Sequence, residues 1–259
     1  MRWDPVLRLV GKNRNPRPEL MESLRDAPLA GDHYADFVLQ WDYQFYRDRV
    51  QMVDFVAADR VLDAGCGLGQ FAAALAAFNR DVVAVDQADW RLETARILCE
   101  RWGCPQVTVE HGMLPDLDYP DESFDLIWCA GVLMFVNRPA TMATFHRLLR
   151  PGGRLYVTIN SRGRWLYKLL AAFFKNDRRN LRKAWRAWRH GHEPDERLGY
   201  LNRRDVPAFC RRHGFEMLGV APDGCLDLSG RRPPRRRPMF ARRFLLFFEN
   251  NIEFVARKK

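Results

Sequence analysis

The sequence has few of the features that mark a secreted, membrane-spanning or metal-binding protein. Its six cysteines form no CxxC pair and no cluster with histidine at zinc-ligand spacing, so we expect reduced thiols, a reducing compartment and no metal site. Residues 1–5 lack the apolar core of a signal peptide. No apolar run approaches the ~20 residues needed to cross a bilayer. We therefore expect a cytoplasmic protein, soluble or peripheral at the inner membrane face.

The chain is long enough to form one sizeable domain. It has 259 residues, of which 47% are hydrophobic, and it shows no internal repeat and no linker that would divide it. We expect a single domain over residues 1–259. Within it we expect an N-terminal arm with helices over 1–55 and two basic inserts over 161–192 and 222–248.

A glycine-rich stretch organises the rest of the chain. Gly65, Gly67 and Gly69 follow a short apolar run and precede the alanine-rich segment 71–78, which predicts a strand, a tight turn and a buried helix. A second apolar run ends on Asp86, whose carboxylate can accept hydrogen bonds from both hydroxyls of a ribose. The third glycine of a dinucleotide fingerprint would fall on Gln70. The turn therefore suits a nucleoside without a pyrophosphate.

Further apolar runs alternate with segments of helical pattern. We expect strands over 107–110, 126–130, 154–159, 215–220 and 251–257. We expect helices over 88–102, 139–149 and 202–213. Such alternation predicts an α/β fold with a doubly wound, mostly parallel sheet.

The motifs in this order resemble those of one enzyme family. Residues 61–69 resemble motif I of class I S-adenosylmethionine (SAM)-dependent methyltransferases, and Asp86 stands where their ribose-binding acid stands. Residues 121–136 and 148–153 resemble the family's stretches around the fourth strand and before the fifth. The resemblance implies a Rossmann-like sheet of seven strands, the last antiparallel between the fifth and sixth. It also implies SAM as cofactor and a small-molecule or lipid acceptor.

The resemblance also assigns the cofactor site, with two departures from the family pattern. The implied cofactor-binding residues are Asp63, Gly65, Cys66, Gly67, Gly69, Asp86, Gln87, Met113, Leu114, Cys129 and Ala130. Many relatives carry an adenine-binding Asp where this chain has Met113, so apolar packing and the Leu114 amide would replace it. Many also carry Glu-His where this chain has Met134-Phe135, so no general base is evident there. The catalytic residue stays unassigned, with His33, Tyr34, His190 and His192 as candidates from the arm and first insert.

The net charge of +10 is unevenly distributed along the chain. Residues 162–189 carry ten basic side chains and one acid, and residues 231–243 carry seven arginines and no acid. Both inserts would leave the carboxyl ends of strands, where ligands bind in such sheets. In the first insert, Leu181, Trp185 and Trp188 share one helical face among arginines.

These basic inserts leave the acceptor open. A basic amphipathic helix with tryptophan suits an anionic membrane or a lipid-linked acceptor. Arginine with aromatic side chains also suits the phosphates and bases of RNA. The tryptophans could equally pack on the core, with the arginines merely solvated. We expect SAM-dependent methyl transfer to a small-molecule or lipid-linked, anionic acceptor. An RNA methyltransferase and a non-catalytic SAM-binding protein remain the alternatives.

Overall fold

The computed structural model describes residue 38 and residues 41–174, 176–190, 200–230 and 251–259. Residues 1–37 and 39–40 of the N-terminal arm and most of the second basic insert therefore lie outside the described residues. The candidate catalytic residues His33, Tyr34 and His192 lie outside them as well.

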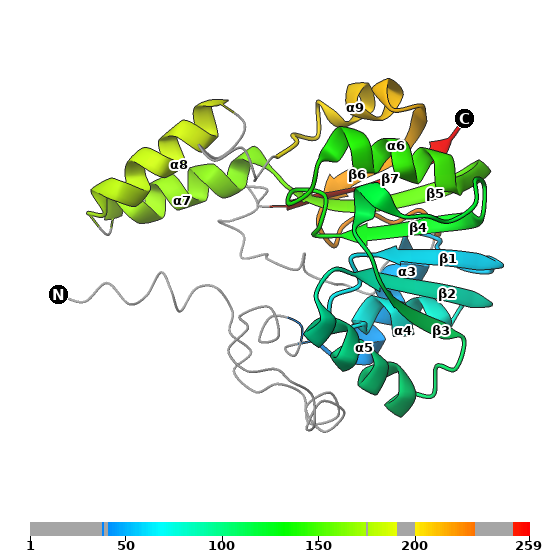
Figure 1. Cartoon of the computed structure of the whole chain (residues 1–259). Coiled ribbons are helices and arrows are strands. Elements are labelled where there is room, and N and C mark those ends of the chain that lie inside the picture. The colour runs from blue at the N-terminus through cyan, green and yellow to red at the C-terminus, as the bar shows by residue number, and fades with distance from the viewer. Residues whose placement is uncertain (1–37, 39–40, 175, 191–199, 231–250) are drawn as a thin grey trace.

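A seven-stranded sheet runs through the molecule in the order β3-β2-β1-β4-β5-β7-β6 (Figure 1). Its strands are β1 (Arg60–Ala64), β2 (Asp81–Asp86), β3 (Val107–His111), β4 (Phe124–Ala130), β5 (Leu149–Asn160), β6 (Phe215–Pro222) and β7 (Asn251–Lys258). Strands β1 to β5 pair in parallel, and β7 pairs antiparallel with both β5 and β6. The predicted fold class and the predicted place of the last strand are confirmed.

Helices cover both faces of the sheet. Helices α3 (Tyr43–Met52), α4 (Gln70–Ala76) and α5 (Asp89–Arg101) pack on one face, and α6 (Arg138–Leu148) and α9 (Val206–Arg212) pack on the other. A short 3-10 helix, η1 (Leu114–Asp116), follows β3. Side-chain caps set two of the helix starts. Asp42 accepts a hydrogen bond from the Phe45 amide at 2.7 Å, and Asn137 accepts one from the Ala140 amide at 3.3 Å.

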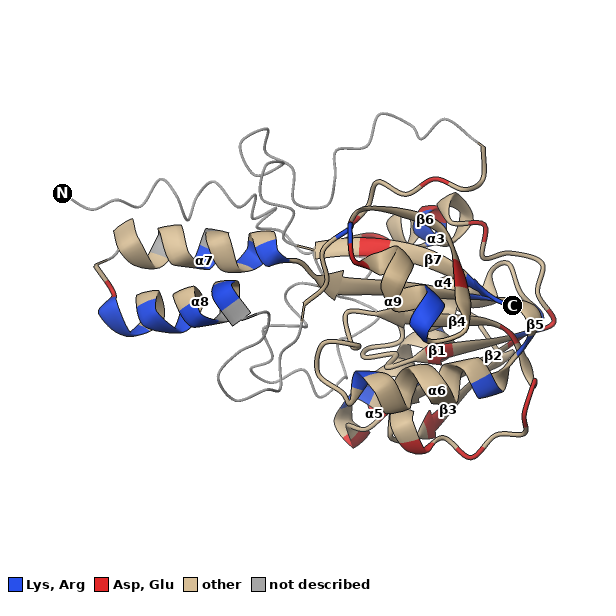
Figure 2. Cartoon of the chain, turned by 90° about the horizontal axis from the view of Figure 1, so that it is seen from above, with Lys and Arg blue, Asp and Glu red and all other residues tan. Residues whose placement is uncertain are grey.

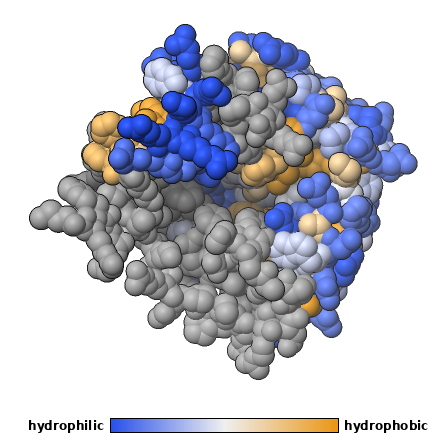
Figure 3. All heavy atoms as spheres, turned by 60° about the vertical axis from the view of Figure 1, so that its left-hand side comes forward, coloured by the Kyte–Doolittle hydropathy of each residue, from blue (hydrophilic) through white to orange (hydrophobic). Residues whose placement is uncertain are grey.

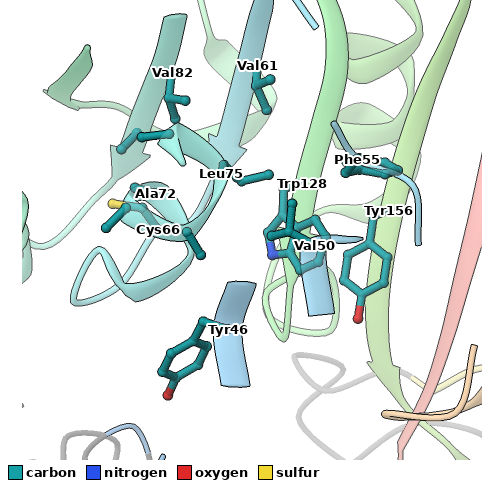
Figure 4. Packing of buried hydrophobic residues seen from close by; sticks show 14 of the residues in the cluster. Tyr46, Val50, Phe55, Val61, Cys66, Ala72, Leu75, Val82, Trp128 and Tyr156 are labelled. Atoms are coloured by element: carbon teal, nitrogen blue, oxygen red, sulfur yellow. The ribbon is translucent and has the colours of Figure 1, made fainter. Parts of the chain in front are cut away.

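Alternating side chains of the strands divide the core into two layers. In β4, Leu126 and Trp128 belong to the layer under α3, α4 and α5, whereas Ile127 and Cys129 belong to the layer under α6 and α9. Figure 4 shows the first layer, in which Trp128 stacks on Tyr156 with ring centroids 3.8 Å apart. The central strands β1, β2 and β4 are buried on both faces because helices cover both, which explains why these strands read as continuous apolar runs in the sequence.

A buried ionic cluster joins α3 to β5, β7 and the loop after β6. The Arg49 guanidinium donates to both oxygens of Glu253, to Asp223 Oδ1 at 3.2 Å and to the Tyr156 hydroxyl at 2.5 Å. Tyr156 in turn donates to Glu253 Oε2 at 2.8 Å, and the amides of Cys225 and Leu226 donate to Glu253 Oε1. The Glu253 side chain is completely buried and Arg49 almost so. These bonds fix α3 against β5, β7 and the loop after β6.

The first basic insert forms a helical hairpin of α7 (Arg162–Phe174) and α8 (Arg178–His190). The hairpin begins directly after β5 and projects away from the sheet (Figures 1 and 2). In the part of the chain that the structure describes, no helix is both long enough and apolar enough to cross a membrane.

Candidate cofactor site

The glycine turn is folded back onto the end of β2. The amides of Gly65 and Cys66 both donate to the Val85 carbonyl, at 2.8 and 2.9 Å. Gly65, Gly67 and Gly69 have φ angles of 82°, 57° and 83°, in the left-handed region that favours glycine. Gly69 is also the residue from which α4 starts. The predicted strand–turn–helix unit is therefore confirmed as local structure.

Two of these glycines also face close neighbours. A Cβ atom on Gly65 would lie 2.4 Å from Val132 Cγ2, in the loop after β4. A Cβ on Gly69 would lie 2.8 Å from the Ala95 Cβ, in α5. Glycines in such a turn let a ligand approach the backbone. The structure adds that Gly65 admits the loop after β4 and Gly69 admits α5.

Asp86 holds the turn from the end of β2. Its Oδ2 accepts a hydrogen bond from the Gly67 amide at 3.0 Å, and its Oδ1 accepts one from the Ala88 amide at 3.0 Å. The side chain is 6% exposed. An ionised carboxylate has about four lone-pair positions, so two backbone donors leave acceptor capacity for ligand hydroxyls. The donors and acceptors at this turn thus fit the ribose of a nucleoside cofactor.

Asp63 lies beneath the turn, near the end of β1. It is 2% exposed, and no hydrogen bond reaches its Oδ2 from the described residues. Burial, followed by the nearby charge of Asp86, raises its pKa to about 8, against a small opposing effect of the Ala72 amide. Burial likewise raises the pKa of the Cys66 thiol well above its usual range. Both groups therefore favour their neutral forms.

The remaining predicted cofactor residues surround the same edge of the sheet but differ in exposure. Gln87 is exposed, and its carbonyl lies 3.1 Å from His111 Nε2. Met113 is 54% exposed, whereas the Leu114 side chain is buried in the core. Leu114 begins η1, so its amide has no acceptor within that helix.

Cys129 and Ala130 end β4 on the same edge. The Cys129 side chain is fully buried in the core layer under α6, so only its backbone can reach a ligand. Burial, followed by the charge of Asp63, raises the pKa of its thiol to about 12. The expectation that Cys129 faces a ligand therefore concerns its backbone and not its sulfur.

The loop after β4 contains a feature that the sequence analysis missed. Met134 is buried at 6% exposure, but Phe135 beside it is 63% exposed. The Phe135 amide donates to the Val132 carbonyl at 2.8 Å, so a turn presents the ring at the site's edge of the sheet. In the sequence Met134 and Phe135 are simply two adjacent apolar residues. The one indication that Phe135 would be exposed was that a short turn cannot bury both side chains.

The structure gives no catalytic candidate a place in the site. His33, Tyr34 and His192 lie outside the described residues, and His190 is the last residue of α8, with a side chain that is not described. Among the described residues, no group of three or more His, Cys, Asp and Glu side chains is placed to bind a metal.

Comparison with known proteins extends these observations. Residues 61–153 match the family model described as a methyltransferase domain. The chain is 31% identical over 120 residues to demethylmenaquinone methyltransferase of Symbiobacterium thermophilum, over 44% of this chain and 47% of that protein. It is 29% identical over 124 residues to phosphoethanolamine N-methyltransferase 3 of Arabidopsis thaliana, over 47% of this chain and 25% of that protein. The chain thus spans less than half the length of these relatives.

Solved structures share the fold at low sequence identity. A geranyl diphosphate methyltransferase in complex with SAM has a TM-score of 0.59 at 14% identity, covering 92% of this chain and 95% of its own. The [4+2]-cyclase SpnF has a TM-score of 0.57 at 18% identity, covering 83% and 81%. A cyclase among these structures shows that the fold alone does not define the reaction. The glycine turn, Asp86 and the family match agree that residues 61–153 are similar to a methyltransferase domain.

Proposed function

We propose that the protein is an enzyme that transfers the methyl group of SAM to a small-molecule acceptor. The observation that carries this proposal is the bonding of Asp86 to the Gly67 amide, since it joins a carboxylate to a glycine turn at the carboxyl edge of a parallel sheet. When bound, SAM supplies an electrophilic methyl group on a positively charged sulfur. The protein then has mainly to hold the cofactor, align an acceptor and exclude water.

The proposed cofactor contacts follow the elements around this edge. Asp86 accepts hydrogen bonds from the ribose hydroxyls, and Asp63 supports the turn from below. Gln87, Met113 and the Leu114 amide surround the adenine, with Met113 contributing apolar contact in place of an acid. The methionine part of the cofactor meets the backbone of six residues: Gly65, Cys66, Gly67, Gly69, Cys129 and Ala130.

A lipid-linked, anionic acceptor is the finer part of the proposal. Two of the relatives are named for methylation of demethylmenaquinone and of phosphoethanolamine. These names support a small-molecule acceptor over a macromolecular one. The exposed Phe135 and Met113 supply apolar contact surface at the site's edge. The first basic insert, α7 and α8, follows β5 at that same edge. Its positive charge favours an anionic acceptor or an anionic membrane.

The test is incubation with methyl-labelled SAM and a cell extract, followed by separation into organic, nucleic-acid, protein and small-solute fractions. Label in the organic or small-solute fraction supports the proposal, and the organic fraction selects the lipid-linked acceptor. Label in RNA would replace it with RNA methylation, with the basic residues gripping phosphates. SAM binding without label in any fraction, repeated with extracts of several organisms, would point to a non-catalytic SAM-binding protein. The Asp86→Ala variant serves as the control for cofactor-dependent labelling.

A further inference from the structure

The α7–α8 hairpin carries a surface that the cofactor site does not use. Its two helices pack on each other through small and apolar residues, with Ala172 and Ala184 buried and Leu181 half-buried. Its base is joined to the body of the molecule. Trp165 is 1% exposed, the Tyr200 hydroxyl donates to the Trp188 carbonyl at 3.1 Å, and the Arg162 guanidinium lies 4.1 Å from the centroid of the Trp188 ring. The far end stands away from the sheet (Figure 1).

One side of the hairpin is strongly basic. All six basic residues of α8 are exposed, namely Arg178, Arg179, Arg182, Lys183, Arg186 and Arg189. The only acid between residues 162 and 190 is Asp177, and it caps α8 by accepting a hydrogen bond from the Asn180 amide at 3.1 Å. Figure 2 shows the basic residues concentrated on α8, with α7 largely free of charged residues along its outer half. This side therefore attracts an extended anionic surface.

The far end of the hairpin is aromatic and exposed. Phe173 and Phe174 are 66% and 75% exposed, at the turn between the helices, with ring centroids 5.7 Å apart. Nearer the base of the hairpin, Trp185 is 47% exposed and stacks on Trp188. These three account for half of the large exposed hydrophobic side chains among the described residues. In Figure 3, hydrophilic side chains gather over this part of the molecule with apolar ones beside them.

The arrangement favours a lipid surface over RNA. On surfaces that bind single-stranded nucleic acid, bases stack on aromatic rings, and cationic side chains between these rings bind the phosphates. Here the phenylalanine pair follows Leu169–Ala172, a segment without charge. The two tryptophans lie among the arginines of α8, but they stack on each other. An apolar tip beside a row of arginines is instead typical of a helical element at a membrane interface.

We propose that the α7–α8 hairpin docks the protein on an anionic lipid bilayer. Phe173 and Phe174 insert among the acyl chains, and the arginines of α8 contact the lipid phosphates. The hairpin leaves the carboxyl end of β5, so docking turns the edge that holds the glycine turn and Phe135 toward the membrane. The inference deepens the proposed function and rests on it for the lipid-linked acceptor, but the docking itself is measurable without any acceptor.

The test is co-sedimentation of the full chain with phosphatidylcholine vesicles, with and without phosphatidylglycerol. We expect binding only to the anionic vesicles, weakened by salt. Arg182→Gln/Arg186→Gln should weaken binding about 30-fold, since each basic residue near such a surface contributes a factor of about five. Phe173→Ser/Phe174→Ser should weaken it about tenfold or more. The control Arg211→Gln/Arg212→Gln removes two exposed arginines from α9 and should leave vesicle binding unchanged.

Equal binding to both kinds of vesicle, or hairpin variants that bind like the parent, would overturn the proposal. RNA binding with no vesicle binding would overturn it as well. A SAM titration of each variant shows that its core is folded. Vesicle binding by a protein that methylates nothing would support the docking and contradict the proposed function. Methylation without vesicle binding would support the proposed function and contradict the docking.

Discussion

At the scale of single residues, the Asp86 carboxylate holds the glycine turn and, in our proposal, also binds the ribose of the cofactor. It already binds two backbone amides, and the proposed ribose contacts use its remaining acceptor positions. We expect Asp86→Ala to weaken SAM binding by about 1.5–3 kcal/mol, as for the loss of a charged hydrogen bond. Calorimetric titration of SAM measures this change. The control is Asp89→Ala, which removes an exposed carboxylate three positions away. Unchanged SAM affinity in Asp86→Ala would refute the assignment.

Asp63 makes stability depend on pH in an unusual direction. Its pKa is raised to about 8 in the folded protein from an ordinary value of 3.8, so between these values the folded state binds more protons than the unfolded state. The free energy of unfolding should therefore fall as the pH rises from about 4 to about 8. Asp223, whose pKa burial raises to about 6 against the opposing effect of Arg49, acts in the same direction over a narrower range.

The Asp63→Asn variant tests this effect because it keeps the shape of the side chain and removes the titration. Urea unfolding across this pH range should show a flatter dependence than the parent protein shows. Asp89→Asn, at an exposed position, should keep the parent's slope. A parent protein whose stability rises steadily over this range would contradict a neutral Asp63.

At the scale of elements, the glycine turn joins the loop after β4 to the end of β1. Gly65 has a φ of +82° and faces Val132, so Gly65→Ala should destabilise the protein both by strain and by steric overlap. Left-handed backbone costs about 1–2 kcal/mol for a residue with a Cβ, and overlap adds about 1–3 kcal/mol. Chemical denaturation measures the total.

Two further variants separate these contributions. Gly103→Ala has a similar φ of +63° but no atom within 4 Å of its Cβ, so it should show the strain alone. Adding Val132→Ala to Gly65→Ala should recover part of the loss by removing the overlapping methyl groups. Equal losses of unfolding free energy in Gly65→Ala and Gly103→Ala would mean that the loop after β4 moves to accommodate the new methyl group at no measurable cost.

At the scale of the whole molecule, the cluster around Arg49 joins parts of the chain that are 204 residues apart. Burial tends to lower the pKa of Arg49, but Glu253, Tyr156 and Asp223 together raise it well above its usual value, so the guanidinium stays charged. Arg49→Met would leave two acids buried without their cation. We expect a loss of about 3–5 kcal/mol in the free energy of unfolding.

The matched control is Arg257→Met, which breaks an ion pair of 2.6 Å with Glu216 that is about half exposed on both sides. That loss should stay below about 1 kcal/mol, because water screens the pair. In a Glu253→Gln background, Arg49→Met should cost less than in the parent protein, since one of the stranded charges is already gone. Additive losses would show that Arg49 stabilises the fold by packing and not by charge.

The sequence by itself determined the order of the elements and the position of the turn. Strand–helix alternation, the glycines at 65, 67 and 69 and the acid ending β2 are local patterns, and each depends on residues close together in the chain. The antiparallel place of β7 was also anticipated, but only through family resemblance, since its partners β5 and β6 are set by long-range pairing. The single-domain boundaries stay a prediction.

Only the tertiary structure decided which side chains meet across the sheet. Arg49, Tyr156, Asp223 and Glu253 come from four distant segments, so no spacing along the chain could indicate their cluster. The contact between Val132 and Gly65 and the burial of the Cys129 thiol could not be predicted from spacing either. The period of a strand predicts which side chains alternate, but not which elements cover each face. The hairpin shows both parts. Its amphipathic spacing was predicted from the sequence. Its projection from the sheet and its two exposed phenylalanines were not predicted, because exposure depends on what packs against a helix.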